Sequence, residues 1–207
     1  MLISGPKSAP LTVVLAHGAG APMDTPFMTF FAEGLAQAGY RAARFEFPYM
    51  AARRKTGAKK PPDRQPVLLE SWRSVIAELR AERLVIGGKS MGGRMASLIA
   101  DDVNVQGLVC LGYPFYGAGR KDKPRTEHLL SLKTPTLICQ GERDPMGDRE
   151  SISQLKLSRA IKVRWLPDGD HDLKPRRASG RTHDENLIDA LDAVCAFLAA
   201  LHERRGA

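Results

Sequence analysis

The sequence contains few cysteines and no long apolar run. Its three cysteines among 207 residues are too few and too far apart for a disulfide framework or a zinc site. No stretch approaches the roughly 20 apolar residues that cross a bilayer, and the first residues lack the basic start and apolar run of a signal peptide. We therefore expect a soluble cytoplasmic protein that does not bind membranes. No residue cluster predicts a metal or an organic cofactor.

The remaining composition is that of an ordinary globular protein. Hydrophobic residues make up 43% of the chain and charged residues 26%, which excludes disorder, collagen and a fibrous coiled coil. Internal repeats and low-complexity segments are missing. The length favours a single domain spanning residues 1–207.

Short apolar runs alternate with amphipathic stretches along the chain. Helical spacing of apolar residues predicts helices near 27–38, 68–79, 95–99 and 187–201. The apolar runs predict six strands, at 11–16, 41–47, 84–87, 107–111, 136–140 and 161–166. This alternation is typical of an α/β fold with an open, doubly wound, mainly parallel sheet of about six strands and helices on both faces. Such sheets bind ligands beyond the carboxyl ends of their strands, so the residues after each strand are candidate site residues.

Residues 88–92 carry the pattern G-x-S-x-G between a short apolar strand and an amphipathic helix. Glycine at 88 and 92 removes side chains that would clash in so sharp a turn. The turn lifts the Ser90 hydroxyl out of the sheet at a helix N-terminus, where the backbone N–H of Met91 faces developing negative charge. Ser90 is therefore the candidate nucleophile. The alternative is a strand-to-helix turn that happens to contain serine.

A nucleophilic serine needs a base, and the base needs an acid to orient it. Asp144 follows the strand at 136–140, with Glu142 as its nearest rival, and His171 lies in the loop after the last strand. The order serine, acid, histidine is the one expected after a nucleophile elbow. We expect His171 to accept the Ser90 proton and Asp144 to hold the imidazole in the right tautomer. The alternative for each residue taken alone is an ordinary surface role, a solvated loop histidine for His171 and a turn-forming aspartate for Asp144.

The loop after the first predicted strand, His17–Gly20, contains small residues that let its backbone approach a substrate oxygen. We expect the N–H of Ala19, or alternatively that of Gly20, to complete an oxyanion hole with Met91. His17 precedes the site and is expected to brace the loop.

From 11 to about 201, these motifs resemble the α/β-hydrolase superfamily, and in particular its compact dienelactone-hydrolase-like members. The resemblance implies hydrolysis of a small carboxylic ester or thioester through an acyl-enzyme. Two departures matter. Dienelactone hydrolases use a cysteine nucleophile, whereas this chain has Ser90. The two antiparallel strands that open larger members have little room in the ten residues before the first predicted strand.

The interval 112–128 is too short for the cap domain that many members of the superfamily carry. We expect an open site bordered by a mobile loop. Tyr113, Phe115 and Tyr116 in that loop are candidates for lining an acyl pocket, and the alternative is that they cover the sheet as core residues.

The charge distribution raises the question of anionic substrates. The chain has 31 basic and 23 acidic residues, and three segments predicted to follow strands are strongly basic, at 53–60, 120–125 and 174–181. An electropositive rim at the Ser90 edge would attract an anionic ester, whereas the alternative is three solvated loops. Nucleic acid is disfavoured because the loops have no interleaved aromatics or groove-entering helix.

Three functions therefore stay open. The leading interpretation is a serine esterase or thioesterase. The alternatives are a hydrolase-fold binding or scaffold protein without turnover, and a small peptidase. The sequence does not indicate an oligomeric state.

Overall fold

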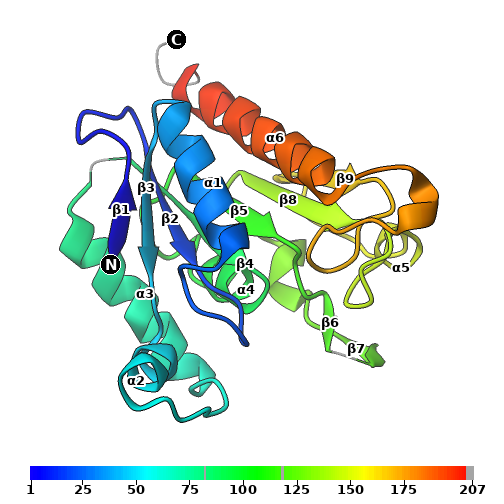
Figure 1. Cartoon of the computed structure of the whole chain (residues 1–207), viewed down its shortest axis with the longest axis horizontal. Helices are drawn as coiled ribbons and strands as arrows, with labels where there is room; N and C mark the ends of the chain where they lie inside the picture. The colour runs from blue at the N-terminus through cyan, green and yellow to red at the C-terminus, as the bar shows by residue number, and fades with distance from the viewer. Residues whose placement is uncertain (82, 118, 204–207) are drawn as a thin grey trace.

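A seven-stranded sheet runs through the molecule (Figure 1). The computed structural model describes residues 1–81, 83–117 and 119–203, with the side chain of Lys121 also outside the description. The strands of the sheet are β1 (Leu2–Ser4), β2 (Thr12–Ala16), β3 (Arg41–Phe45), β4 (Leu84–Lys89), β5 (Gly107–Leu111), β8 (Thr136–Gly141) and β9 (Ile161–Leu166). They lie in the order β1-β3-β2-β4-β5-β8-β9, where β1 is antiparallel to β3 and all other neighbours are parallel.

Helices cover both faces of this sheet, which confirms the predicted doubly wound architecture. α1 (Pro26–Gln37) and α6 (His183–Glu203) lie over one face (Figure 1), and their buried side chains share an apolar cluster with it. α3 (Gln65–Leu79) and α4 (Met91–Ser97) pack on the other face. There Trp72 is fully buried, and its ring meets Phe45 edge to face at 4.7 Å between centroids.

The topology places a crevice between β2 and β4. The chain leaves β2 through α1 toward β3, then returns through α3 to β4 on the other side of β2. Because the crossovers diverge there, the carboxyl ends of β2 and β4 form the switch point at which such sheets bind ligands. His17 follows β2 and Ser90 follows β4.

The predicted start and end of the first helix are confirmed. The Thr25 hydroxyl oxygen caps α1 by accepting a hydrogen bond from the backbone N–H of Met28 at 3.3 Å, and proline occupies the first turn. Gly39 follows the helix with φ +85°, a left-handed conformation that favours glycine.

Several elements of the fold were not predicted. The sheet has a seventh strand, β1, which has three residues and forms an exposed edge. Part of the basic segment 53–60 belongs to the helix α2 (Pro48–Thr56), which is hydrophilic and buries only Tyr49 and Met50. The interval 112–128 contains a hairpin of β6 (Tyr116–Gly117) and β7 (Arg120–Pro124) and the 3₁₀ turn Glu127–Leu130, instead of an irregular loop. Such short or hydrophilic elements lack the apolar periodicity on which prediction depends.

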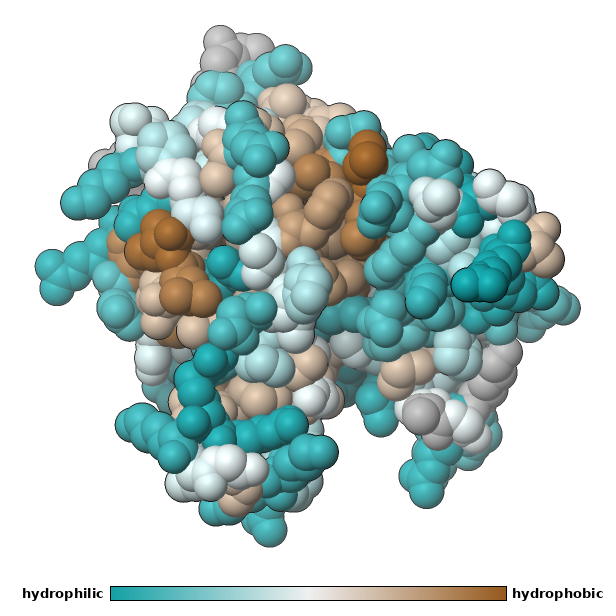
Figure 2. All heavy atoms as spheres, in the orientation of Figure 1, coloured by the Kyte–Doolittle hydropathy of each residue, from teal (hydrophilic) through white to brown (hydrophobic). Residues whose placement is uncertain are grey.

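The remaining described elements are α5 (Arg149–Ser153) and the 3₁₀ turn Arg177–Ser179. Figure 2 shows apolar side chains gathered over the seam between α1 and α6, while hydrophilic side chains cover α2. None of the helices in the described ranges is long and apolar enough to cross a membrane.

Candidate active site

Ser90 lies on a strained turn between β4 and α4. Its backbone adopts φ 51° and ψ −117°, a region that costs a residue other than glycine about 1–3 kcal/mol. Its N–H donates to the Leu111 carbonyl at 3.0 Å, which helps to hold the turn. A Cβ on Gly88 would lie 2.1 Å from the Ala16 carbonyl oxygen, and one on Gly92 would lie 2.4 Å from the same atom. Both glycines are therefore required for the elbow to pack against β2.

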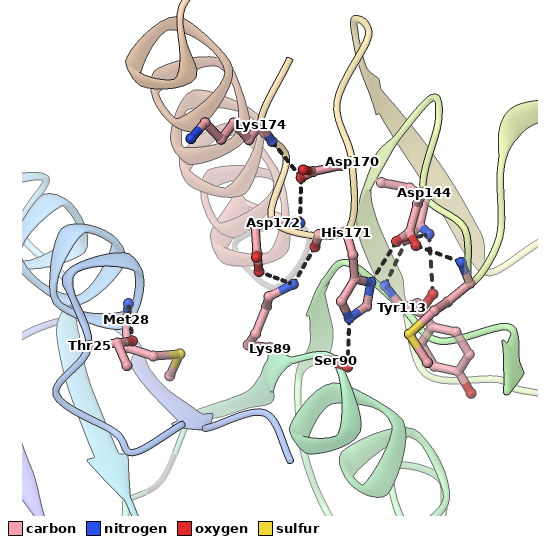
Figure 3. A network of polar contacts seen from close by, with 12 residues as sticks. Thr25, Met28, Lys89, Ser90, Tyr113, Asp144, Asp170, His171, Asp172 and Lys174 are labelled. Carbon is pink, nitrogen blue, oxygen red and sulfur yellow. Dashed lines mark hydrogen bonds and ion pairs between the residues drawn. The ribbon is translucent and has the colours of Figure 1, made fainter. Parts of the chain in front are cut away.

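His171 stands between Ser90 and Asp144 (Figure 3). Its Nε2 is 2.8 Å from Ser90 Oγ, and its Nδ1 is 2.8 Å from Asp144 Oδ2. With the ring proton on Nδ1, the imidazole donates to the carboxylate and accepts from the serine hydroxyl. The loop that carries His171 packs directly on the end of β8, since a Cβ on Gly141 would lie 2.3 Å from the Asp170 carbonyl oxygen.

Asp144 is fully buried and held by more than the histidine. Its Oδ1 accepts from the backbone N–H of Met146 at 2.8 Å, and its Oδ2 accepts from Gln140 Nε2 at 2.8 Å. The rival Glu142 instead pairs with Arg149 at 2.7 Å. The structure therefore brings Asp144, and not Glu142, to the imidazole.

His17 is fully buried at the base of the loop after β2. Its Nδ1 donates to the Gly18 carbonyl at 2.7 Å, and its Nε2 accepts from the backbone N–H of Phe47 at 3.2 Å. Burial lowers the pKa of His17. A neutral imidazole with both nitrogens occupied fits the bracing role predicted for it.

Two carbonyl oxygens of the same loop accept hydrogen bonds from buried side chains that anchor it. The Gly18 oxygen accepts from His17, and the Ala19 oxygen accepts from the Tyr49 hydroxyl at 2.8 Å. Because the N–H of a trans peptide points opposite to its carbonyl, the N–H groups of Ala19 and Gly20 point away from these anchors. Within the described residues, no hydrogen bond occupies either N–H or that of Met91. Three donors are thus free beside Ser90.

A cleft of about 640 Å³ opens over Ser90 and His171. Its lining is mostly apolar and comes from the segment after β2 and the start of α1, with one side chain from the turn after β8: Pro22, Pro26, Phe27, Met28 and Met146. Lys89, Lys174 and His183 add polar atoms. Apolar lining with a few polar groups is typical of a small-molecule site.

The predicted acyl-pocket aromatics do not line this cleft. Tyr113 and Phe115 are fully buried and Tyr116 is 6% exposed, and all three belong to the core cluster beneath α3 and α4. Gln140 anchors the first of them, since its side-chain amide accepts from the Tyr113 N–H at 2.7 Å and donates to the Tyr113 carbonyl at 3.2 Å. The prediction is corrected because the segment after β5 folds inward onto the sheet.

The basic segments are largely neutralised or lie away from the cleft. Arg54 pairs with Asp24 and Glu46, and Arg176 pairs with Asp168. Of the cations in the three segments, the described lining of the cleft includes Lys174. The basic rim is therefore weaker than the sequence alone indicates.

Two functional residues escaped the sequence analysis, Gln140 and Lys89. Gln140 orients Asp144, and Lys89 lines the cleft beside Ser90. Each is a polar side chain at the carboxyl end of an apolar strand, Lys89 as the last residue of β4 and Gln140 as the last but one of β8, and this is the one sequence signal that could have found them. In the part of the chain that the structure describes, no group of three or more histidine, cysteine or acidic residues could hold a metal ion.

Comparisons with known proteins found a matching family and a related sequence. A family described as alpha/beta hydrolase domain matches residues 9–199. A protein of Pongo abelii named "Putative protein-lysine deacylase ABHD14B" is 31% identical over 159 residues, which cover 76% of this chain and 74% of that protein.

Solved structures share the fold. XC6422 from Xanthomonas campestris, described as an α/β serine hydrolase without lid, superposes with a TM-score of 0.72 at 21% identity, over 96% of this chain and 87% of that one. Est1E from Butyrivibrio proteoclasticus superposes with a TM-score of 0.69 at 15% identity, over 96% and 92% of the two chains. The lack of a cap domain in this fold agrees with the short interval after β5.

Proposed function

This chain belongs to the alpha/beta hydrolase domain family, and from that premise we propose that it is a serine hydrolase acting on small carboxylic esters or thioesters. The observation that carries the proposal is the unbroken series of 2.8 Å contacts from Asp144 through His171 to Ser90. The free N–H groups beside Ser90 and the open apolar cleft support it.

In the proposed reaction, Ser90 Oγ attacks the acyl carbonyl carbon while His171 Nε2 takes the hydroxyl proton. Buried Asp144 stabilises the imidazolium that forms. The oxyanion accepts hydrogen bonds from Met91 N–H and from Ala19 or Gly20 N–H. His171 then returns the proton to the departing alcohol or thiol, and water hydrolyses the acyl-enzyme by the same steps.

The cleft indicates the kind of substrate. Its apolar lining at the start of α1 suits an alkyl or aryl group on the acyl or leaving side. If the substrate also carries an anionic group, Lys174 is the cation to meet it, because Lys89, the other lysine of the described lining, is paired with Asp172. The three free cysteines, two of them buried, support a role in a reducing compartment such as the cytoplasm.

Amide deacylation is a second candidate, favoured by the name of the Pongo abelii relative. The same residues can in principle release an acyl group from a lysine side chain, because the site is open to the surface and lacks a cap domain. An acetyl-lysine peptide assayed beside an aryl acetate separates the two activities by their kcat/KM values.

Covalent labelling tests the proposal most directly. We expect a fluorophosphonate probe to add once to the wild type and not to Ser90→Ala, as read by intact mass. His171→Ala should label at least a hundredfold more slowly, because the serine loses its base. Failure of a folded wild-type protein to label would overturn the hydrolase proposal and favour the non-catalytic binding protein.

A further inference from the structure

Lys89 is a buried cation beside Ser90 that the reaction above does not use. It is the last residue of β4, and its side chain is 10% exposed. Burial lowers the pKa of Lys89, and the charge of Asp172 opposes that effect. A buried charge is costly unless its partners compensate for it, so its partners indicate its role.

Those partners lie on two segments that are distant in the sequence (Figure 3). Lys89 Nζ donates to the backbone carbonyl of His171 and lies 3.1 Å from Asp172 Oδ1. It also stands over the ring of Phe27, 5.3 Å from the centroid. One side chain thus links the nucleophile elbow to the loop that carries the candidate base and to the start of α1.

The segment after β5 leaves room for this contact. Gly112 has φ +65°, and a Cβ there would lie 2.6 Å from the His171 carbonyl oxygen and 3.0 Å from Lys89 Nζ. The same Cβ would lie 3.5 Å from His171 Nδ1. Any side chain at position 112 would therefore push apart Lys89 and the histidine loop.

We propose, on the basis of the hydrolase function above, that Lys89 is a positioning residue for the base. Its ammonium group clamps the backbone of His171 and the side chain of Asp172 to the end of β4. Because Lys89 and Ser90 are consecutive, this clamp fixes the histidine loop relative to the nucleophile itself. It maintains the 2.8 Å contact between His171 Nε2 and Ser90 Oγ from the side opposite Asp144.

Three variants separate this role from a general effect on stability. Lys89→Met keeps the length of the side chain but removes the charge, and Lys89→Arg keeps the charge. Lys162→Met makes the same chemical change at an exposed lysine of β9. We expect the fluorophosphonate labelling rate to fall about 10- to 100-fold in Lys89→Met, to recover in part in Lys89→Arg, and to stay at the wild-type value in Lys162→Met.

The pH profile gives a readout that a purely structural lysine would not move. The clamp is strongest while Lys89 is protonated, so it is present below the lowered pKa of Lys89 and weakens as the pH rises through it. The wild-type labelling rate should therefore decline at a pH below the ordinary range of a lysine. Lys89→Arg should lack this decline, because arginine keeps its proton.

Side-chain ¹⁵N NMR of His171 tests the clamp independently of turnover. We expect one sharp set of imidazole signals in the wild type, and broadened or doubled signals in Lys89→Met. That result would support the clamp even if the wild type did not label, in which case only the hydrolase proposal would fail. Labelling and imidazole signals both unchanged in Lys89→Met would overturn the clamp and leave the hydrolase proposal standing.

Asp172→Asn keeps the test decisive if Lys89→Met does not fold. This variant leaves the lysine in place and weakens its contact with an exposed carboxylate, while its contacts with the His171 carbonyl and the Phe27 ring remain. We expect labelling to slow severalfold and the alkaline decline to move to lower pH, because the lysine loses the charge that favours its protonated form. A wild-type rate and pH profile in Asp172→Asn would overturn the proposal.

Discussion

The segments that follow β2 and β5 reach Ser90 from neighbouring strands on either side of β4, and they contribute very different surfaces. The segment after β2 has no phenylalanine, tyrosine or tryptophan before it enters α1, yet together with the first residues of α1 it supplies most of the cleft lining. The segment after β5 has three aromatic residues and supplies none of the described lining, because their rings are buried in the core. Aromatic content therefore does not tell which segment forms the site wall.

The difference comes from what each segment is anchored to. After β5, Tyr113 is held by the buried amide of Gln140 and its ring packs edge to face with Phe115 at 4.8 Å. After β2, the carbonyl oxygens of Gly18 and Ala19 accept hydrogen bonds from the buried side chains of His17 and Tyr49. The segment after β5 is thereby drawn into the sheet. The N–H groups of the segment after β2 point away from their anchors, on a loop that lines the cleft together with Ser90.

The largest effect on stability should come from truncating a buried aromatic residue of the segment after β5. Phe115→Ala removes a fully buried ring, so we expect the free energy of unfolding to fall by about 3–5 kcal/mol. Urea denaturation measures this directly. Activity per folded molecule should change much less. A stable variant with a raised KM would show instead that Phe115 contacts substrate.

Gln140→Met should give the next largest effect, because Gln140 contacts both the segment after β5 and the candidate acid of the site. It removes the partners of the Tyr113 N–H and carbonyl and one donor to Asp144. Leaving buried polar groups unpaired costs about 1–3 kcal/mol, and kcat should fall about tenfold or more as the carboxylate loses its orientation. An unchanged kcat in the folded variant would show that Met146 and His171 hold Asp144 without Gln140.

Phe27→Ala tests whether the start of α1, which lines the cleft, contacts the substrate. We expect KM for an ester with a bulky apolar group to rise about tenfold, since the half-buried ring loses roughly 1.4 kcal/mol of contact with the substrate. The destabilisation should be smaller than that of Phe115→Ala. Steady-state kinetics with acetyl and longer acyl esters provide the measurement. Equal KM changes for short and long acyl groups would place the substrate elsewhere.

Lys174→Met should give the smallest effect. Exposed charges are screened in water, so we expect KM for an anionic ester to rise only two- to threefold, with no change for a neutral one. Raising the salt concentration should have the same selective effect on the wild type. Equal salt responses of the two esters would remove the reason to propose an anionic substrate.

Much of the fold could be read from the sequence because strong local patterns carry it. All six predicted strands are present, and the helix after Thr25 begins and ends where its cap and Gly39 indicate. The missed elements are β1, α2, the β6–β7 hairpin, the five-residue helix α5 and the two 3₁₀ turns. Each is short or hydrophilic and depends on tertiary contacts instead of on an apolar stripe.

The sequence also predicted part of the candidate site. Residues that follow parallel strands meet at one edge of the sheet, which is why Ser90, Asp144 and His171 could be placed together before their distances were known. The sequence already favoured Asp144 over Glu142 in the same turn, and in the structure it is the Asp144 carboxylate that lies against the imidazole, while Glu142 pairs with Arg149. Lys89 was missed because its polar partners lie 82 or more residues further along the chain, and Gln140 because a polar side chain near the end of a strand does not by itself show what it will contact.

The sequence by itself determined the nucleophile elbow. The pattern that marks this turn falls within five residues, and the fold explains its two glycines, because a Cβ on either Gly88 or Gly92 would clash with the Ala16 carbonyl of β2. Only the tertiary structure decided which segment lines the cleft, which arginines are paired, and that Lys89 reaches a carbonyl 82 residues away. The physical reason is that backbone strain is local, whereas burial and charge pairing depend on which surfaces the fold brings together.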